Sequence, residues 1–305
     1  MSPTTSEISA LKSRSSAFFK ESQEKICSVL EKLDGRGSFV RDRWSHPQGG
    51  GGDTRVIENG GVFEKGGVNF SDVSGHLNDK LAERLGVASQ PFQATGISLV
   101  LHPLSPMVPT VHFNLRYLEL ENGDRWFGGG TDLTPYYLNE KDVVHFHTSL
   151  KRVCDQHDLT FYPRFKKACD EYFYLKHRRE ARGAGGIFFD YLRDQPEHSF
   201  DFVQKIGNTF LDAYIPIVQN RMNDAWGEPE RQWQLHRRGR YVEFNLIYDR
   251  GTLFGLETNG RTESILMSLP PMATWDTRMQ PVPGSREAQL LEAITSPKNW
   301  ILPGS

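Results

Sequence analysis

Clusters of glycine that separate short apolar runs constrain the fold of this chain most strongly. The 305 residues include 28 glycines, many of them in groups of two to four, as at 49–52 and 128–130. The runs between the groups are strand-like, and several connections have hairpin length, with Asn122-Gly123 as the clearest turn. Short connections make neighbouring strands antiparallel. The segments expected as strands are 55–58, 62–65, 96–102, 110–121, 125–128, 187–192, 241–249 and 252–257.

Amphipathic patterns with capping signals predict helices around these strands. A capping box at 4–7 precedes a helical pattern that reaches residue 33, and Asn139 is placed to cap a later helix. Pro216 is expected to kink or break the helix that begins at residue 201. The helices expected after the first are 77–85, 140–157, 164–182, 201 to about 226, and 285–294. Because helices come in blocks and do not alternate one-for-one with strands, the predicted fold is α+β: a mainly antiparallel sheet covered by helices, in a single domain, 1–305.

The charge balance excludes some classes of function. Lysine and arginine number 36 against 38 aspartates and glutamates, a formal net charge of −2, and no long run of one sign occurs. A nucleic-acid partner is therefore not expected. The clean apolar runs are far shorter than the roughly 20 residues that a membrane-spanning helix needs, so no span is expected either.

Cysteine usage and the N-terminal segment bear on the compartment. Cys27, Cys154 and Cys169 cannot all pair with one another, and none of them forms a CxxC couple, which indicates a reducing compartment. A mitochondrial presequence is rich in arginine and poor in acids, whereas Arg14 is the only arginine before Arg36 and several glutamates interrupt the segment. The expected location is cytoplasmic.

One predicted strand with three polar residues on a single face is the most informative segment of the chain. Because side chains alternate along a strand, His112, Asn114 and Arg116 are expected on one face and apolar residues on the other. On the strand before it, Ser98 and His102 also share a face, so His102 could lie near His112. Such a row can simply be the solvated face of an antiparallel sheet. Two histidines, an amide and a guanidinium without lysine or glutamate are unusual for a solvated face, and the pattern favours a binding site.

Further histidines raise the question of a metal. His145 and His147 are two residues apart on a predicted helix, about 200° around its axis, so only one of them can belong to a shared site. The possible ligand set is His102, His112, His147 and His177. The sequence has no HxxxH or HxxEH spacing and no cysteine partner for these residues. A role in handling protons or orienting a ligand fits at least as well, so no metal is favoured.

Three further segments offer polar groups at turns or strand ends. The run 126–135 contains three successive glycines and Asp132, but it lacks the lysine and the following helix of a phosphate-binding loop. These glycines either let backbone amides approach a flat ligand or mark a bulged strand end, and the residues alone do not decide between the two. Asp249 stands in one turn, and Arg261 ends another at 259–261, where it is free to bind a carboxylate.

Long stretches of the sequence resemble one enzyme family. They lie between Phe39 and about Pro271 and include PQGGGGDTRVIENGGVFEKGGVNFS, LHPLSPMVPTVHFNLRY, WFGGGTDLTPYY, YPRFKKACDEYFYLKHRREARGAGGIFFD and YVEFNLIYDRGTLFGL. The chain is similar to the oxygen-dependent coproporphyrinogen III oxidases, the aerobic enzymes of haem biosynthesis. The resemblance implies that two propionate side chains of coproporphyrinogen III become vinyl groups, giving protoporphyrinogen IX, carbon dioxide and hydrogen peroxide. Molecular oxygen is the implied co-substrate, no organic cofactor is required, and a divalent metal stays an open question.

The resemblance also implies roles for individual residues. His112 matches the family's proton donor, and Asp249 and Arg116 match residues implicated in handling the pyrrole and its propionate. The residues that match substrate-binding positions are Ser98, Asn114, Leu115, Arg116, Asn259, Gly260 and Arg261. Asn259 stands where bacterial members usually have glycine, and asparagine tolerates the φ > 0 backbone of such a turn. Residues 275–277, Trp-Asp-Thr, depart from the Trp-Glu-Tyr that is common in the family.

The family further implies a large, flat, seven-stranded antiparallel sheet sandwiched between layers of α-helices. It also implies a homodimer whose interface lies partly in 241–276.

The implied chemistry agrees with the residue types. Coproporphyrinogen III carries four propionates, so a nearly neutral enzyme needs local arginines, and Arg116 and Arg261 suit bidentate binding. Asp249 could draw away the pyrrole N–H proton so that the electron-rich ring reacts with oxygen without a metal, while His112 manages protons near the propionate. Two alternatives stay open: a tetrapyrrole carrier, and a metal-dependent oxygenase that uses the histidines. Three dispersed cysteines do not supply the clustered iron–sulfur site of the anaerobic route.

Overall fold

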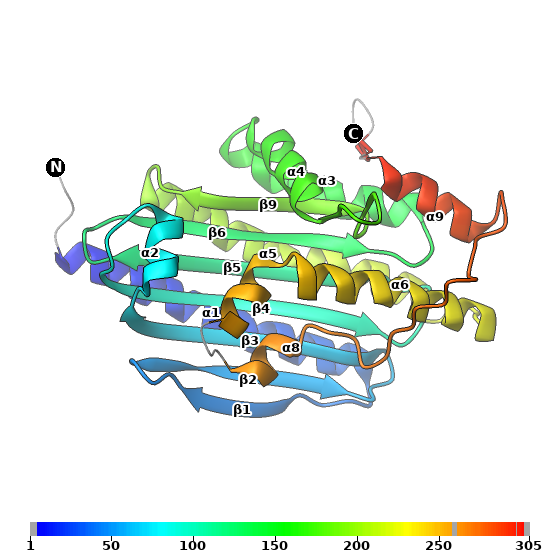
Figure 1. The fold of residues 1–305 in the computed structure, drawn as a ribbon, viewed down its shortest axis with the longest axis horizontal. Coiled ribbons are helices and arrows are strands. Elements are labelled where there is room, and N and C mark those ends of the chain that lie inside the picture. Colours follow the sequence, from blue (N-terminus) through cyan, green and yellow to red (C-terminus); the bar gives the residue numbers. More distant parts are fainter. Residues whose placement is uncertain (1–4, 258–260, 297, 302–305) are drawn as a thin grey trace.

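One antiparallel sheet forms the centre of the computed structural model, which describes residues 5–257, 261–296 and 298–301. Its seven strands follow the order β1-β2-β3-β4-β5-β6-β9, and every neighbouring pair is antiparallel (Figure 1). The strands are β1 Val40–Ser45, β2 Gly50–Glu58, β3 Phe63–His76, β4 Pro91–Pro103, β5 Thr110–Leu120, β6 Arg125–Thr134 and β9 Gly185–Leu192, and a separate small hairpin consists of β7 Tyr174–Leu175 and β8 Glu180–Ala181. The predicted α+β class and the seven-stranded antiparallel sheet are confirmed.

Helices cover both faces of this sheet. In the view of Figure 1, α1, α3 and α5 lie behind the sheet, and α6 and α8 lie in front of it. The helices are α1 Thr5–Asp34, α2 Asp79–Leu85, α3 Glu140–His157, α4 Phe161–Tyr172, α5 Pro196–Arg221, α6 Glu228–Ile247, α7 Arg250–Glu257, α8 Thr262–Leu266 and α9 Arg286–Thr295. None of these described helices has the length and apolar character needed to span a membrane.

The main core lies between the back face of the sheet and the helices behind it. Alternation along β5 sends Val111, Phe113 and Leu115 to that face, where all three are fully buried. Helices supply the opposite wall, with Phe19 on α1 and Phe210 on α5, and the Phe210 ring lies 4.7 Å from that of Phe113. Because the apolar residues of β5 take the back face, its polar residues point to the front, as predicted.

The segment 241–257 is helical except at 248–249, and the prediction of two strands there is wrong. Its first part continues α6, and its second part is α7. The buried residues of α6 recur at helical spacing, as Trp233, Arg237, Tyr241 and Phe244 do. The first nine residues of the segment, taken alone, also alternate between polar and apolar types as a strand does. The residues that decide for a helix lie upstream of the segment.

Two helix boundaries also need correction. Helix α4 ends at Tyr172 and not at residue 182, because the chain turns there into the β7–β8 hairpin. Helix α5 starts earlier than predicted and runs through Pro216 without a break. Tyr214 and Ile217, on either side of this proline, are fully buried, and such packing supports a helix at an unfavourable residue.

Other helix predictions are confirmed. Helix α3 occupies the predicted residues, and the Asn139 side chain accepts a hydrogen bond from the N–H of Asp142. Helix α9 begins after Ser285, whose side chain accepts a hydrogen bond from the N–H of Ala288. The predicted capping box of α1 includes Thr4, which lies outside the described residues.

Candidate functional site

The front face of the sheet is hollowed where β4 and β5 approach the junction of α6 and α7. A cavity of about 390 Å³ lies there, and a smaller one of about 170 Å³ adjoins it. The residues that line both are Asn69, Ser98, His112, Asp249 and Gly251. His112, Asn114 and Arg116 all line the larger cavity, so the predicted polar row faces a pocket of the size that holds small organic ligands.

His112 belongs to a chain of hydrogen bonds that crosses the front face of β5 and β6. Its Nδ1 lies 2.9 Å from Asp132 Oδ1, and the two residues are register partners on the neighbouring strands. Its Nε2 lies 3.1 Å from Asn114 Nδ2. Arg116 Nη1 donates to Asn114 Oδ1 over 2.9 Å, and Arg116 Nη2 lies 2.9 Å from Asp190 Oδ2. Each polar side chain of the row is therefore held by its neighbours before any ligand arrives.

A buried arginine anchors the inner end of this chain. Arg182 Nη2 lies 2.8 and 2.9 Å from the two carboxylate oxygens of Asp132, and both side chains are almost fully buried. The guanidinium carbon of Arg182 lies 4.1 to 4.8 Å from the ring centroids of three aromatic residues, Phe173, Tyr241 and Phe244. Burial opposes ionisation of Asp132, but Arg182 and His112 outweigh it, so the pKa of this carboxyl is lowered. Asp132 is thus an ionised acceptor beneath His112.

Asp249 lies between α6 and α7 with both carboxylate oxygens held. The Tyr172 hydroxyl donates to Oδ1 over 3.0 Å, and the N–H of Thr252 donates to Oδ2 over 2.7 Å. The second bond satisfies a backbone donor in the first turn of α7. Asp249 was predicted in a turn between two strands, whereas it lies at the junction of two helices. It still lines both cavities.

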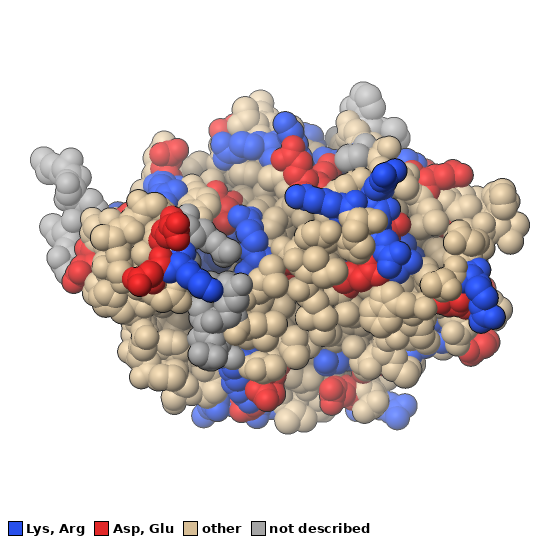
Figure 2. All heavy atoms as spheres, in the orientation of Figure 1, with Lys and Arg blue, Asp and Glu red and all other residues tan. Residues whose placement is uncertain are grey.

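Two arginines of the larger cavity differ in their partners. Arg116 is paired with Asp190. Of the carboxylates in the described residues, none lies within ion-pair distance of Arg250, whose guanidinium carbon lies 4.7 Å from the Tyr172 ring centroid and 5.7 Å from that of Phe188. Elsewhere on this front face, basic and acidic groups are interspersed (Figure 2). Arg250 is therefore a cation at the cavity that an anionic ligand can engage without displacing a carboxylate.

Sequence reasoning missed several residues that shape the cavity. The residue types and patterns gave no role to Arg250, Tyr172, Phe188 or Asp190. The Tyr172 and Phe188 rings stack with centroids 4.5 Å apart and planes 3° from parallel, and they form an aromatic wall. A signal for part of this was present, because alternation along the predicted strand 187–192 places Phe188 and Asp190 on one face.

The glycines of β6 leave room for neighbouring side chains. A Cβ at Gly128 would lie 2.8 Å from the guanidinium carbon of Arg116 and 2.7 Å from the Asp190 carboxylate. The register of β6 against β9 shifts between Phe127 and Gly129, so the strand is irregular at this point. Of the two expectations for this run, the irregular strand end is observed, and the close approach at Gly128 is made by the Arg116–Asp190 ion pair.

The other predicted histidines do not line the cavity beside His112. Nε2 of His102 lies 2.8 Å from the Ser268 carbonyl oxygen, and Nε2 of His147 lies 3.1 Å from the Ala184 carbonyl oxygen. Burial lowers the pKa of His147 to about 3 and that of His102 well below its usual value. Neither lines either cavity, so His102, although it lies on the same face of the neighbouring strand as predicted, does not share the cavity of His112.

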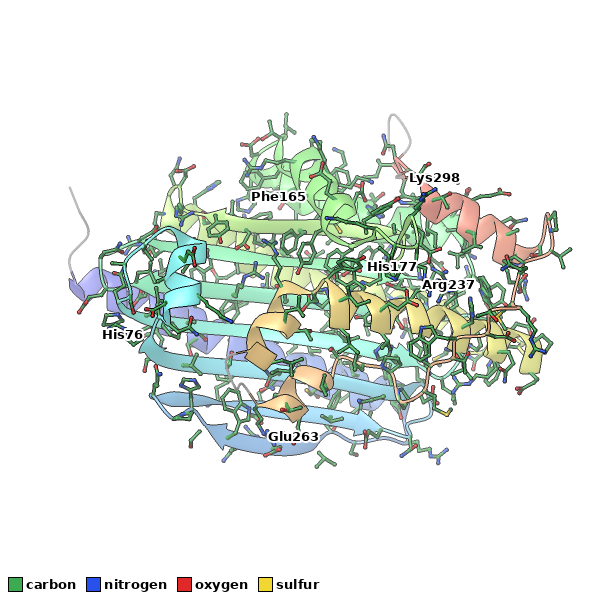
Figure 3. The ribbon with its side chains drawn as sticks, viewed as in Figure 1. His76, Phe165, His177, Arg237, Glu263 and Lys298 are labelled. Atoms are coloured by element: carbon green, nitrogen blue, oxygen red, sulfur yellow. The ribbon has the colours of Figure 1, made fainter. Side chains whose placement is uncertain are left out.

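His177 also makes contacts outside the cavity. Its Nε2 lies 2.7 Å from the Glu243 carboxylate on α6, in the region near Arg237 (Figure 3). His145 contacts the backbone carbonyl of Asp212, so neither His145 nor His147 belongs to the site, contrary to the expectation that one would. In the part of the chain that the structure describes, no group of three or more His, Cys, Asp or Glu side chains could hold a metal ion.

The remaining predicted substrate-binding residues divide into two groups. Ser98 and Leu115 line the larger cavity. Arg261 bonds to Asp42 of β1 and lines neither cavity, while 259–260 lie outside the described residues. The structure therefore brings together most of the predicted site but not Arg261.

The sequence was also compared with models of known protein families. A family model described as coproporphyrinogen III oxidase matches residues 14–300 of the 305. The match includes every strand and helix that contributes to the two cavities.

Proposed function

This chain belongs to the coproporphyrinogen III oxidase family, and we propose that it catalyses the oxygen-dependent reaction of that name. Two propionate side chains of coproporphyrinogen III become vinyl groups, and the products are protoporphyrinogen IX, carbon dioxide and hydrogen peroxide. The observation that carries the proposal is that a carboxylate, a histidine and two arginines line one cavity: Asp249, His112, Arg116 and Arg250.

The cavity suits a tetra-anionic macrocycle. Arg250 has no carboxylate partner among the described residues, and Arg116 can exchange its partner Asp190 for a propionate. Guanidinium groups bind carboxylates by paired, charge-assisted hydrogen bonds. The stacked rings of Tyr172 and Phe188 offer an apolar surface to the pyrroles. Because the whole protein is nearly neutral, this local pairing supplies the attraction for the substrate.

The proposed chemistry assigns Asp249 to the pyrrole and His112 to the protons near the side chain. Asp249 accepts the hydrogen bond of the pyrrole N–H and draws its proton, which makes the ring more reactive toward oxygen. For each propionate, one oxygen molecule accepts two electrons and a proton is taken up. The C–C bond to the carboxylate breaks, a hydrogen leaves the neighbouring carbon, and a vinyl group, carbon dioxide and hydrogen peroxide result. Fixed groups of this kind accelerate reactions mainly by orientation and electrostatics.

We propose that no metal is required. Support comes from the contacts of His102, His147 and His177, which are each engaged by other groups of the protein. Enzyme freed of metal by exhaustive chelation is expected to keep its full rate, measured as product per minute in metal-free buffer. Loss of activity that one added metal restores would overturn this prediction.

We also propose a homodimer that uses part of 241–276. Exposed apolar side chains on this segment support it, and they are Leu246, Ile247, Leu256, Met272 and Trp275. Surfaces that cluster such residues commonly meet a partner. The proposed location is the cytoplasm, and the three buried free cysteines, Cys27, Cys154 and Cys169, support a reducing compartment.

Product analysis tests the proposed function and separates it from a tetrapyrrole carrier. A carrier would use the same arginines to hold the ligand and would return it unchanged. Incubation of the purified protein with coproporphyrinogen III, followed by chromatography after oxidation to the fluorescent porphyrins, is expected to yield protoporphyrin. Stoichiometric recovery of coproporphyrin would favour the carrier.

A further inference from the structure

The donors and acceptors along the polar chain determine the protonation of His112. Arginine has only donors, so the atom of Asn114 that lies 2.9 Å from Arg116 Nη1 must be the amide oxygen. The amide NH₂ group then faces His112 Nε2 at 3.1 Å, and it can only donate. His112 Nε2 must therefore be an acceptor, without a proton.

The other ring nitrogen has the opposite role. His112 Nδ1 lies 2.9 Å from Asp132 Oδ1, which is an ionised acceptor because Arg182 contacts both oxygens of this carboxylate. Nδ1 must carry the proton. A doubly protonated imidazole would set an N–H against the amide NH₂ of Asn114, and turning that amide would set its NH₂ against Arg116. The contacts are consistent with one arrangement only, the neutral ring with its proton on Nδ1.

Arg182 is the residue on which this arrangement depends. Without a cation, Asp132 would be a buried carboxylate that takes up a proton, and it could then donate to His112 instead of accepting. One guanidinium nitrogen, Nη2, contacts both oxygens of Asp132, and Nη1 donates to Asn245 Oδ1 over 3.0 Å. The aromatic rings around it leave the cation little freedom to move away.

We propose that Arg182 is a positioning residue: it keeps Asp132 ionised, and Asp132 in turn fixes the proton of the neutral His112 ring on Nδ1. The resting site then presents His112 Nε2 to the cavity region as a proton acceptor, with the Asn114 amide as its temporary partner. The proposal rests on the proposed function for its chemical meaning: His112 takes up a proton at Nε2 before it can give one back. Asn114 must release Nε2 for that step, and a propionate that engages Arg116 is positioned to loosen the Arg116–Asn114 link.

The ¹⁵N resonances of the His112 ring test this in the protein without substrate, because protonated and unprotonated imidazole nitrogens resonate far apart. The wild type is expected to show a protonated Nδ1 and an unprotonated Nε2 at neutral pH. Asn114→Asp replaces the amide donor by an acceptor and is expected to place a proton on Nε2. Asn69→Asp adds the same charge to the same cavity without contacting His112, and it is expected to leave Nε2 unprotonated.

Variants of Arg182 test the anchoring role. In Arg182→Met the His112 proton is no longer expected to stay on Nδ1 alone. Arg182→Lys keeps the positive charge, and its His112 proton is expected to stay on Nδ1. Arg221→Met, which removes an arginine from another Arg–Asp pair, is expected to leave the His112 signals unchanged. In steady-state kinetics, Arg182→Met is expected to lower kcat by about 100-fold with KM within about threefold, because the His112 proton is misplaced while binding is not impaired, and Arg182→Lys is expected to recover most of that loss.

The outcomes separate this inference from the proposed function. A protonated Nε2 in the wild type, or unchanged His112 signals in a folded Arg182→Met, would overturn the positioning role whatever the enzyme's activity. If Arg182→Met does not fold, Arg182→Gln, which loses the charge but keeps a hydrogen-bond donor, takes its place, and unchanged His112 signals in that variant would equally overturn the positioning role. The predicted ring state together with unchanged coproporphyrinogen would refute the proposed reaction and leave the role of Arg182 intact.

Discussion

Asp249→Asn is expected to lower the turnover of coproporphyrinogen III by about a thousandfold, the range that loss of a general base produces. Asparagine keeps an oxygen that can accept from Thr252 N–H, so the start of α7 is preserved. The amide of asparagine cannot take up the pyrrole proton. Its NH₂ group would face either the pyrrole N–H or the Tyr172 hydroxyl. The substitution therefore removes the proposed chemistry while leaving the cavity almost unchanged in shape.

The measurement compares kcat with binding of fully oxidised coproporphyrin III, which serves as an unreactive ligand. Affinity is expected to stay within a few-fold of the wild type, since the substitution keeps the size of the side chain and leaves the arginines that attract the tetra-anion unchanged. Asp158→Asn is the matched control, because Asp158 also accepts a backbone N–H, that of Thr160, and it does not line the cavity. Near-normal turnover of Asp249→Asn would remove Asp249 from the mechanism.

The double variant Arg116→Gln/Arg250→Gln is expected to bind coproporphyrin III about a thousandfold more weakly. Each charge-assisted pair with a carboxylate contributes about 2 kcal/mol, or roughly thirtyfold in affinity, and the two contributions add for separate propionates. The two single variants are expected to differ. Arg116 must leave Asp190 to bind a propionate, whereas Arg250 has no such competitor among the described residues, so Arg250→Gln should be the more damaging change.

Fluorescence titration of the porphyrin measures these affinities. Arg193→Gln is the control, because it removes the same charge from an arginine that already forms two hydrogen bonds to Asp124. Its affinity for coproporphyrin III is expected to equal that of the wild type within about twofold. Equal losses in Arg193→Gln and the double variant would mean that net charge, and not the two named arginines, governs binding.

The part of the site that the sequence predicts well is the part that a single strand defines. His112, Asn114 and Arg116 share a face because side chains alternate along any strand, whatever packs on it. Their exposure to a cavity could be favoured from residue types alone, because no lysine or glutamate interrupts the row. The sheet itself was predictable from hairpin-length connections between strands.

The features that the sequence did not predict depend on contacts between residues that are far apart in the chain. Arg182 was assigned to the end of a helix, but α4 ends at Tyr172 and the following hairpin carries the arginine under Asp132. Nothing local marks Arg182 as the partner of a residue fifty positions earlier. The alternation in 241–249 is equally compatible with a strand and a helix, and the packing of α6 decides for the helix.

The predicted histidine set includes residues that the structure does not bring into one site. His102 and His112 lie on one face of neighbouring strands, as predicted, yet His102 is engaged by the backbone of Ser268 and does not line the cavity. Sharing a face does not establish a shared site, because the segment that covers each residue is unknown from sequence. Arg261 illustrates this as well, since its contact with Asp42 takes it to β1.

Oxygen dependence is the most direct test of the account. The purified protein is incubated with coproporphyrinogen III in air and, in parallel, under argon, and protoporphyrinogen IX, carbon dioxide and hydrogen peroxide are quantified. Product is expected in air only, with one carbon dioxide and one hydrogen peroxide for every vinyl group formed. Equal product under argon, or bound but unchanged substrate in air, would contradict it.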